Sequence, residues 1–255
     1  MTKIATPLIT IATPLITKPK ILITGTGRCG TTFLIKLFTF LEFDTGYTKE
    51  NYMESIYKNC NSGMEKKITD NYYIIKDPEF LEQIDEIITN SDISIKQIII
   101  PIRDYTLSAK SRVFHNNEAG LSNKSNQIPG GLRNAHNEEE QIQFYNKLIS
   151  NYVFNMIKHN INTLFLDFDK MVNNKQYLFD KLKHILDEKK ISFETFSKTY
   201  DEVSETSKPK KLLLFEKLKD ILNEKNIDFE LFSNIYDGVV DISKHDFYNS
   251  SSSSS

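Results

Sequence analysis

The chain of 255 residues contains only two cysteines, Cys29 and Cys60, and no tryptophan. Two cysteines are too few for a disulfide framework, which favours a reducing, cytoplasmic compartment. No apolar run reaches the roughly 20 residues that span a bilayer, and Pro7 and Pro14 interrupt the apolar runs near the N-terminus. We therefore expect neither a membrane span nor a cleavable signal. The formal net charge of -2 gives no overall basic field, so nucleic acid is not an expected partner and any anion site must be local.

Arginine is also scarce, because lysine supplies most of the 32 basic residues. The four arginines are Arg28, Arg103, Arg112 and Arg133. Arginine has a planar fork of donors that suits bidentate contact with phosphate or sulfate oxygens, whereas lysine serves wherever a generic positive charge is enough. Three of the four arginines lie in the two segments that carry the anion-site motifs described below.

Apolar segments of two kinds alternate along the chain. Runs typical of buried strands occupy residues 21–24, 72–76, 95–104 and 162–169. Helical spacing of apolar residues follows at 31–41, from 78, at 104–115, at 139–159 and from about 170. Strands that alternate with helices predict an α/β domain with a central parallel sheet and crossover helices. Residues 116–138 are rich in Asn, Ser and Gly, which predicts a long surface loop.

The two ends of the chain are repetitive. Residues 4–10 and 11–17 both read IATPLIT, and we interpret residues 1–19 as a leader that carries no chemistry. Six serines close the chain, which predicts a disordered tail over 246–255.

A longer duplication lies before that tail. Residues 178–204 align with 214–240 at an offset of 36, with 17 of 27 positions identical. A solenoid needs at least about three repeats. We therefore expect a core domain over 20–190 and a helical extension over 191–245 that contains most of the duplication.

The stretch "ILITGTGRCGTTFLIKLF", residues 21–38, runs from a predicted strand through a glycine-rich turn into a predicted helix. Such a turn presents backbone N–H groups and the positive end of the helix dipole to an anion. Gly25 and Gly30 have the spacing of the nucleotide-binding loop G-x-x-x-x-G-K-[ST], but Thr31 replaces its lysine. The positive charge stands instead at Arg28, which indicates an anion other than a nucleoside triphosphate.

The pattern R-x-G-T-T-F-L after a strand resembles the 5′-phosphosulfate-binding loop of the sulfotransferases that use 3′-phosphoadenosine 5′-phosphosulfate (PAPS). In that family an arginine that ends a later strand, and a serine eight residues on, hold the 3′-phosphate of the cofactor; Arg103 and Ser111 match them here. Lys76, in "IIKDPEF", matches a lysine that lies near the sulfuryl group. The resemblance covers about residues 20–190 and implies a three-layer P-loop fold.

The resemblance implies a reaction in which a sulfuryl group passes from PAPS to a hydroxyl or amine of a small-molecule or carbohydrate acceptor. No metal is expected, because the leaving group is a phosphate held by protein donors. The expected cofactor-binding residues are Gly27, Arg28, Cys29, Gly30, Thr31, Thr32, Arg103 and Ser111. The expected catalytic residues are Arg28, Lys76 and Asp77, with Asp77 as general base ahead of Asp44 and His115. Asp77 precedes Pro78, so it is equally suited to cap a helix.

Two other interpretations fit the sequence. A nucleotide or small-molecule kinase would use Asp167 and Asp169, at the end of the strand in "TLFLDFD", to hold magnesium. A non-catalytic binding protein would keep the fold without a base or a lid. The glycine-rich loop that covers the cofactor in sulfotransferases has no recognisable counterpart near the C-terminus, and the 116–138 loop is the candidate substitute.

Overall fold

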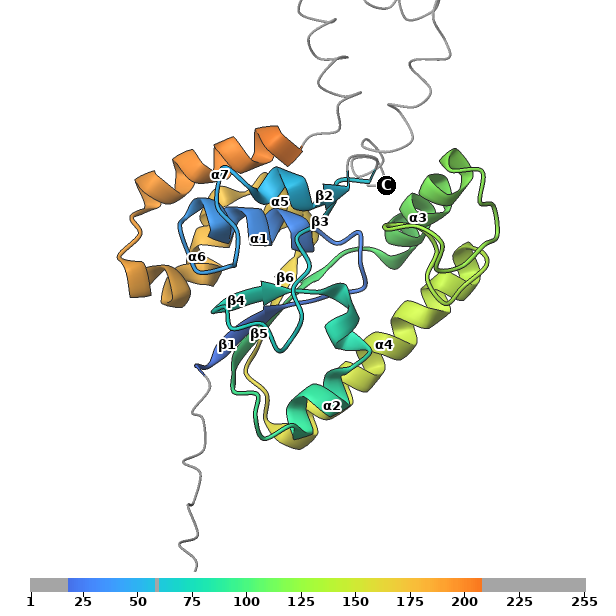
Figure 1. Cartoon of the computed structure of the whole chain (residues 1–255), viewed down its shortest axis with the longest axis horizontal. Coiled ribbons are helices and arrows are strands. Elements are labelled where there is room, and N and C mark those ends of the chain that lie inside the picture. Colours follow the sequence, from blue (N-terminus) through green and yellow to red (C-terminus); the bar gives the residue numbers. More distant parts are fainter. Residues whose placement is uncertain (1–17, 58–59, 208–255) are drawn as a thin grey trace, which may run out of the picture.

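The computed structural model describes residues 18–57 and 60–207. Its centre is a parallel sheet of four strands in the order β4-β1-β5-β6 (Figure 1). The strands are β1 Lys20–Ile23, β4 Ile74–Lys76, β5 Ile95–Ile102 and β6 Thr163–Asp167. A separate two-stranded hairpin pairs β2 Ile56–Tyr57 with β3 Ser62–Gly63.

Helices connect the strands and cover both faces of the sheet. They are α1 Thr31–Phe40, α2 Ile84–Thr89, α3 Tyr105–Glu118, α4 Glu138–His159, α5 Phe168–Asn173, α6 Lys175–Leu186 and α7 Phe193–Ser207. Three short 3-10 helices complete the elements of the described residues: η1 Tyr52–Ser55, η2 Pro78–Leu81 and η3 Asp187–Lys189. Figure 1 shows α1, α6 and α7 on one side of the sheet, and α2 and α4 on the other.

The alternation of strand side chains divides the core into two layers. Ile21 and Ile23 of β1 point to the layer formed with α1, α6 and α7, while Leu22 points to the layer that contains η2, α2 and Tyr152 of α4. Helix α1 is buried along its whole length, because the sheet lies on one side of it and α7 on another. The glycine-rich turn that precedes α1 is therefore joined to one of the most enclosed elements of the fold.

Pro101 lies within the central strand β5, paired with Leu166 of β6. The N–H of Ile98 donates to Asn162 on the β6 side, so by strand alternation the nitrogen of Pro101 faces the β1 side. Strand β1 has already ended there, since its pairing with β5 stops at Ile99. The missing N–H of Pro101 therefore removes no hydrogen bond from the sheet, which is the condition under which proline is tolerated in a strand.

The predicted α/β architecture with a parallel sheet flanked by helices is confirmed, and each predicted strand is present. Several boundaries differ by a few residues, and two of these differences have a clear local cause. The strand expected to reach residue 169 ends at Asp167, because that side chain accepts a hydrogen bond from the N–H of Lys170 and begins α5. The helix expected from residue 78 starts as the 3-10 turn η2 and becomes α-helical only at Ile84.

The duplicated region is divided by the limit of the described residues. Its first copy contains most of α6, η3 and most of α7. Phe196, Tyr200 and Val203 of α7 are buried in the same core layer as α1, so core packing continues past residue 190. The second copy, the leader at 1–17 and the serine-rich tail lie outside the described residues. Within the described part of the chain, no helix has the length and apolarity to cross a bilayer.

Candidate anion site

The glycine-rich turn that joins β1 to α1 has left-handed backbone angles at three positions. Gly27, Arg28 and Gly30 have φ values of 79°, 57° and 87°, in the left-handed region that glycine adopts without strain. Gly30 is the N-cap of α1, and no side chain caps that end of the helix. Within the described part of the chain the first N–H groups of α1 therefore have no side-chain cap, which is the arrangement that suits an anion.

Arg112, in α3, holds the turn in place. Its Nη2 donates to the carbonyl oxygen of Thr26 at 3.1 Å, its Nε donates to the Tyr145 hydroxyl at 2.7 Å, and its Nη1 donates to the carbonyl oxygen of Gly131. A Cβ on Gly27 would lie 2.0 Å from Nη2. The absence of a side chain at Gly27 thus lets a buried guanidinium hold the turn and the 116–138 loop together.

Arg28 points from the turn toward α3 and the hairpin. Its Nε donates to Ser111 Oγ at 3.1 Å and its Nη1 to the carbonyl oxygen of Cys60 at 2.5 Å. Its Nη2 lies 2.8 Å from Nε2 of His115; because a guanidinium only donates, this imidazole nitrogen accepts. Burial lowers the pKa of Arg28 to about 10, and the positive charges of Arg112 and Arg103 add to that effect.

Arg103 follows the last residue of β5 and completes a group of three guanidinium groups. Its Nη1 donates to the carbonyl oxygen of Arg28 at 3.1 Å, and its Cζ lies 4.7 Å from the centre of the Phe168 ring. Arg103 and Ser111, which the sequence predicts as a pair, therefore both contact Arg28. Arg103 contacts its backbone carbonyl oxygen, and Ser111 contacts its side chain. An open cavity of about 330 Å³ beside Arg103 is lined by Ile102, Arg103, Asp104, Tyr105, Asp167 and Asp169.

Lys76 ends β4, next to Ile23 at the end of β1. Its side chain is buried, and Nζ donates to the carbonyl oxygen of Gly63 at 3.0 Å and to Glu65 Oε1 at 2.5 Å. Glu65 also lines a cavity of about 280 Å³ with residues of the hairpin region: Tyr47, Glu54, Ser55, Ile56, Tyr57 and Met64. Lys76 thus lies at the end of the strand beside the turn, and it has an acidic partner.

The three candidate bases named from the sequence occupy different surroundings. Asp77 directly follows Lys76, and its carboxylate accepts from the N–H of Glu79 at 2.9 Å as the N-cap of η2. Burial raises its pKa to about 6. The backbone carbonyl of Asp44 accepts hydrogen bonds from the N–H groups of Tyr73 and Ile74. Asp44 therefore lies at the start of β4, whereas the turn follows the other end of the neighbouring parallel strand β1. Burial, together with the charge of Arg28, lowers the pKa of His115 to about 4, so it is a weak base.

The remaining cofactor-binding predictions concern backbone positions more than side chains. The thiol of Cys29 is fully buried, and burial raises its pKa. The side chains of Thr31 and Thr32 are also buried in the first turn of α1. All three residues are therefore enclosed in this structure.

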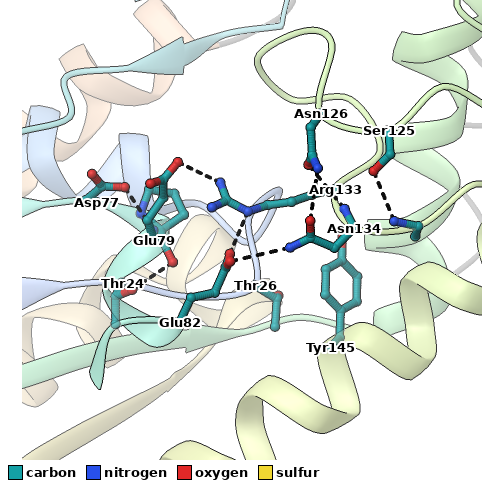
Figure 2. A network of polar contacts seen from close by, with 12 residues as sticks. Thr24, Thr26, Asp77, Glu79, Glu82, Ser125, Asn126, Arg133, Asn134 and Tyr145 are labelled. Atoms are coloured by element: carbon teal, nitrogen blue, oxygen red, sulfur yellow. Dashed lines mark hydrogen bonds and ion pairs between the residues drawn. The ribbon is translucent and has the colours of Figure 1, made fainter. Parts of the chain in front are cut away.

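The 116–138 loop folds back over this region and is tied to η2. Arg133 Nη1 lies 2.9 Å from Glu79 Oε1, and its Nε lies 2.6 Å from Glu82 Oε1. Figure 2 shows Arg133 between these two carboxylates, with Asn134 beside it in contact with Asn126 and Glu82. A Cβ on Gly130 would lie 3.4 Å from Nη1 of Arg28. The predicted surface loop therefore lies against the turn and Arg28.

Two contributions to the site have no signal in the sequence motifs. Glu65 directly follows a hairpin of two-residue strands, which are too short to show a periodic pattern, and it is 11 residues before Lys76. The role of Arg112 depends on contacts with Thr26, which is 86 residues away. The scarcity of arginine is the one signal that indicated Arg112.

The acidic pair proposed for magnesium lies beside the arginine group. Asp167 caps α5 and is 3.8 Å from Nζ of Lys170, while Asp169 is exposed on the first turn of α5. Among the described residues no group of three His, Cys, Asp or Glu side chains is placed to hold a metal ion.

Comparisons of the chain with protein-family models, with curated proteins and with solved structures found no match.

Proposed function

We propose that this chain binds PAPS at the glycine-rich turn and acts as a sulfotransferase. The observation that carries the proposal is the group formed by Arg28, Arg103 and Arg112 around an uncapped helix N-terminus. The named partners of Arg28 and Arg112 are neutral: carbonyl oxygens, hydroxyls and an imidazole. Buried cations with neutral partners are costly, and a bound anion would lower that cost.

The residues present are suited to PAPS, which carries anionic groups at two positions. The turn from Gly27 to Thr32 and the guanidinium of Arg28 would hold the 5′-phosphosulfate. Arg103 and Ser111, which meet at Arg28, would hold the 3′-phosphate. When bound, PAPS supplies an activated sulfuryl group; the protein contributes fixed donors that stabilise negative charge on the oxygens of that group.

Lys76 and its neighbours would act on the acceptor side of the turn. The ammonium of Lys76 supplies positive charge at the end of β4, and its side chain is held by Gly63 and Glu65. Glu65 and Asp77 are the carboxylates positioned to take a proton from an acceptor hydroxyl or amine. Burial raises the pKa of Asp77 to about 6, while Glu65, the partner of Lys76, lines the 280 Å³ cavity.

Ligand binding tests the proposal without knowledge of the acceptor. Isothermal calorimetry would compare adenosine 3′,5′-bisphosphate in the absence of metal with ATP plus magnesium. We expect the bisphosphate to bind, and Arg28→Ala and Arg103→Ala each to weaken binding by about ten- to a hundred-fold, the value of a charge-assisted hydrogen bond. Lys158→Ala is the charge control, because Lys158 is exposed in the last turn of α4. Binding of magnesium-ATP alone would overturn the proposal and favour the kinase.

Transfer of labelled sulfate from PAPS to a panel of hydroxyl and amine acceptors would identify the base. Asp77→Asn keeps the cap of η2, because asparagine caps as well as aspartate does, but it cannot take a proton. If Asp77 is the base, transfer by the unchanged chain rises with pH through about 6 and transfer by Asp77→Asn is lost. If transfer survives in Asp77→Asn and is lost in Glu65→Gln, Glu65 is the base.

A further inference from the structure

The first copy of the 36-residue duplication packs against α1 through one face. Its buried apolar side chains lie on α6 and α7 and belong to the core layer that contains α1. They are Leu178, Leu182, Ile185, Leu186, Phe196, Tyr200 and Val203. Tyr200 also donates its hydroxyl to the carbonyl oxygen of Met171 at 3.0 Å and packs edge-on against Phe33 of α1 at 5.4 Å. The first copy thereby holds both α5 and α1 in place.

The second copy carries all seven of these core side chains. At an offset of 36 they are Leu214, Leu218, Ile221, Leu222, Phe232, Tyr236 and Val239. Ten of the 27 aligned positions differ, and eight of those ten are exposed in the first copy. The exceptions are Thr199, which is buried and aligns with Ile235, and Ser204, which is half-buried and aligns with Val240. The face that contacts α1 is thus retained, and the differences lie mainly on the solvent face.

We infer that the second copy, residues 214–240, is an alternative occupant of the α1 face and replaces the first copy there when the first copy is displaced. In that arrangement residues 175–210 become an insertion between α5 and the second copy. The entropy cost of closing a loop rises only slowly with its length. The chain can therefore accommodate the exchange without change to the sheet or the anion site.

Local features explain why the first copy occupies the face in this structure. Asn174 caps α6 by accepting from the N–H of Tyr177 at 2.9 Å, but the aligned Lys210 cannot cap a helix N-terminus in this way. Glu202, within α7, aligns with Gly238, which is a poor helix former. Each difference weakens the second copy by about three- to five-fold in the equilibrium between the two occupants. The second copy is therefore the minor occupant.

Paired substitutions in the full chain test the exchange. Leu182→Asp with Ile185→Asp places charges in the core face of the first copy, and Leu218→Asp with Ile221→Asp is the matched change in the second. We expect the second-copy pair to leave the midpoint of thermal unfolding unchanged. We expect the first-copy pair to lower it by roughly 3–8 °C with cooperativity retained, because the two differences together amount to about 10- to 25-fold in the equilibrium and this shifts the midpoint of a domain of this size by that amount.

The chain with all four substitutions has no intact copy and is expected to lose cooperative unfolding. If the first-copy pair alone is as damaging as all four substitutions, the second copy cannot replace the first and the inference is overturned. Light scattering identifies the source of the replacement: the first-copy variant is expected to have the same molar mass in solution as the unchanged chain. Rescue that occurs only in a dimer would show that the segment comes from another chain, and would also overturn the inference.

A deletion provides a second measurement. Removal of residues 175–210 joins Asn174 to Lys211, which keeps the N-cap and places the second copy in the register of the first. This chain is expected to unfold cooperatively and to bind adenosine 3′,5′-bisphosphate as the full chain does. Failure to fold, or loss of binding that the full chain retains, would count against the exchange, whereas absence of binding in both chains would count against the proposed function alone.

Discussion

Substitution of Gly27 by alanine should destabilise the protein far more than its backbone angle alone requires. Gly27 has φ of 79°, where an alanine costs about 1–2 kcal/mol. The new Cβ would also lie 2.0 Å from Nη2 of Arg112. An arginine tip usually moves aside easily, but this one is buried and donates to Thr26, Gly131 and Tyr145. Its displacement breaks at least one charged hydrogen bond, which costs about 1.5–3 kcal/mol.

The total expected loss for Gly27→Ala is therefore about 3–5 kcal/mol. Gly120 provides a matched control, because it has a similar φ of 68° and its Cβ would meet nothing within 4 Å. Gly120→Ala should cost only the backbone term of about 1–2 kcal/mol. Since the chain has no tryptophan, urea unfolding is best followed by far-UV circular dichroism, with free energies from linear extrapolation.

A double-mutant cycle isolates the clash. In an Arg112→Met background the guanidinium is absent, so Gly27→Ala should cost no more than Gly120→Ala does. Equal losses for Gly27→Ala and Gly120→Ala in the unchanged chain would refute the assignment of Arg112 as the group that holds the turn. A loss for Gly27→Ala that persists undiminished in the Arg112→Met background would refute it as well.

Two further predictions concern pH. Burial lowers the pKa of Lys36, in α1, to about 8. Between that pH and pH 10.5, the ordinary pKa of lysine, folding therefore releases a proton. Lys36→Met should raise the free energy of unfolding by about 1–3 kcal/mol at pH 7, and urea titrations should show that this gain vanishes as the pH rises toward 10.5. The pKa of His115 is lowered from 6.5 to about 4, so its contribution to stability is present above 6.5 and lost as pH falls toward 4. His115→Gln, which can still accept from Arg28, should reduce the loss of stability over that range; an unchanged pH profile would exclude His115 as its cause.

Much of the sheet was predictable because its strands are buried on both faces and appear as continuous apolar runs. The turn was predictable because its glycines are required by positive φ and by a close guanidinium, both of which restrict the sequence. The hairpin of β2 and β3 was not, since two-residue strands have no detectable period.

Contacts between distant residues were the other limit. The pairing of Glu65 with Lys76, and of Arg28 with His115, depends on how α3 and the hairpin approach the turn. The amphipathic pattern of α7 indicates that one face is buried but does not identify α1 as its partner. The placement of α7 in the core therefore had to come from the structure.

The complete burial of α1 has a consequence for how a ligand would associate. An element enclosed on every side has no room to shift, so the N–H groups at its start are held in a fixed orientation before any anion arrives. Such preorganisation removes an entropy cost from binding. It also leaves the 116–138 loop, which Arg133 and Arg112 tie across the site, as the part whose opening would set the rate of ligand entry and release.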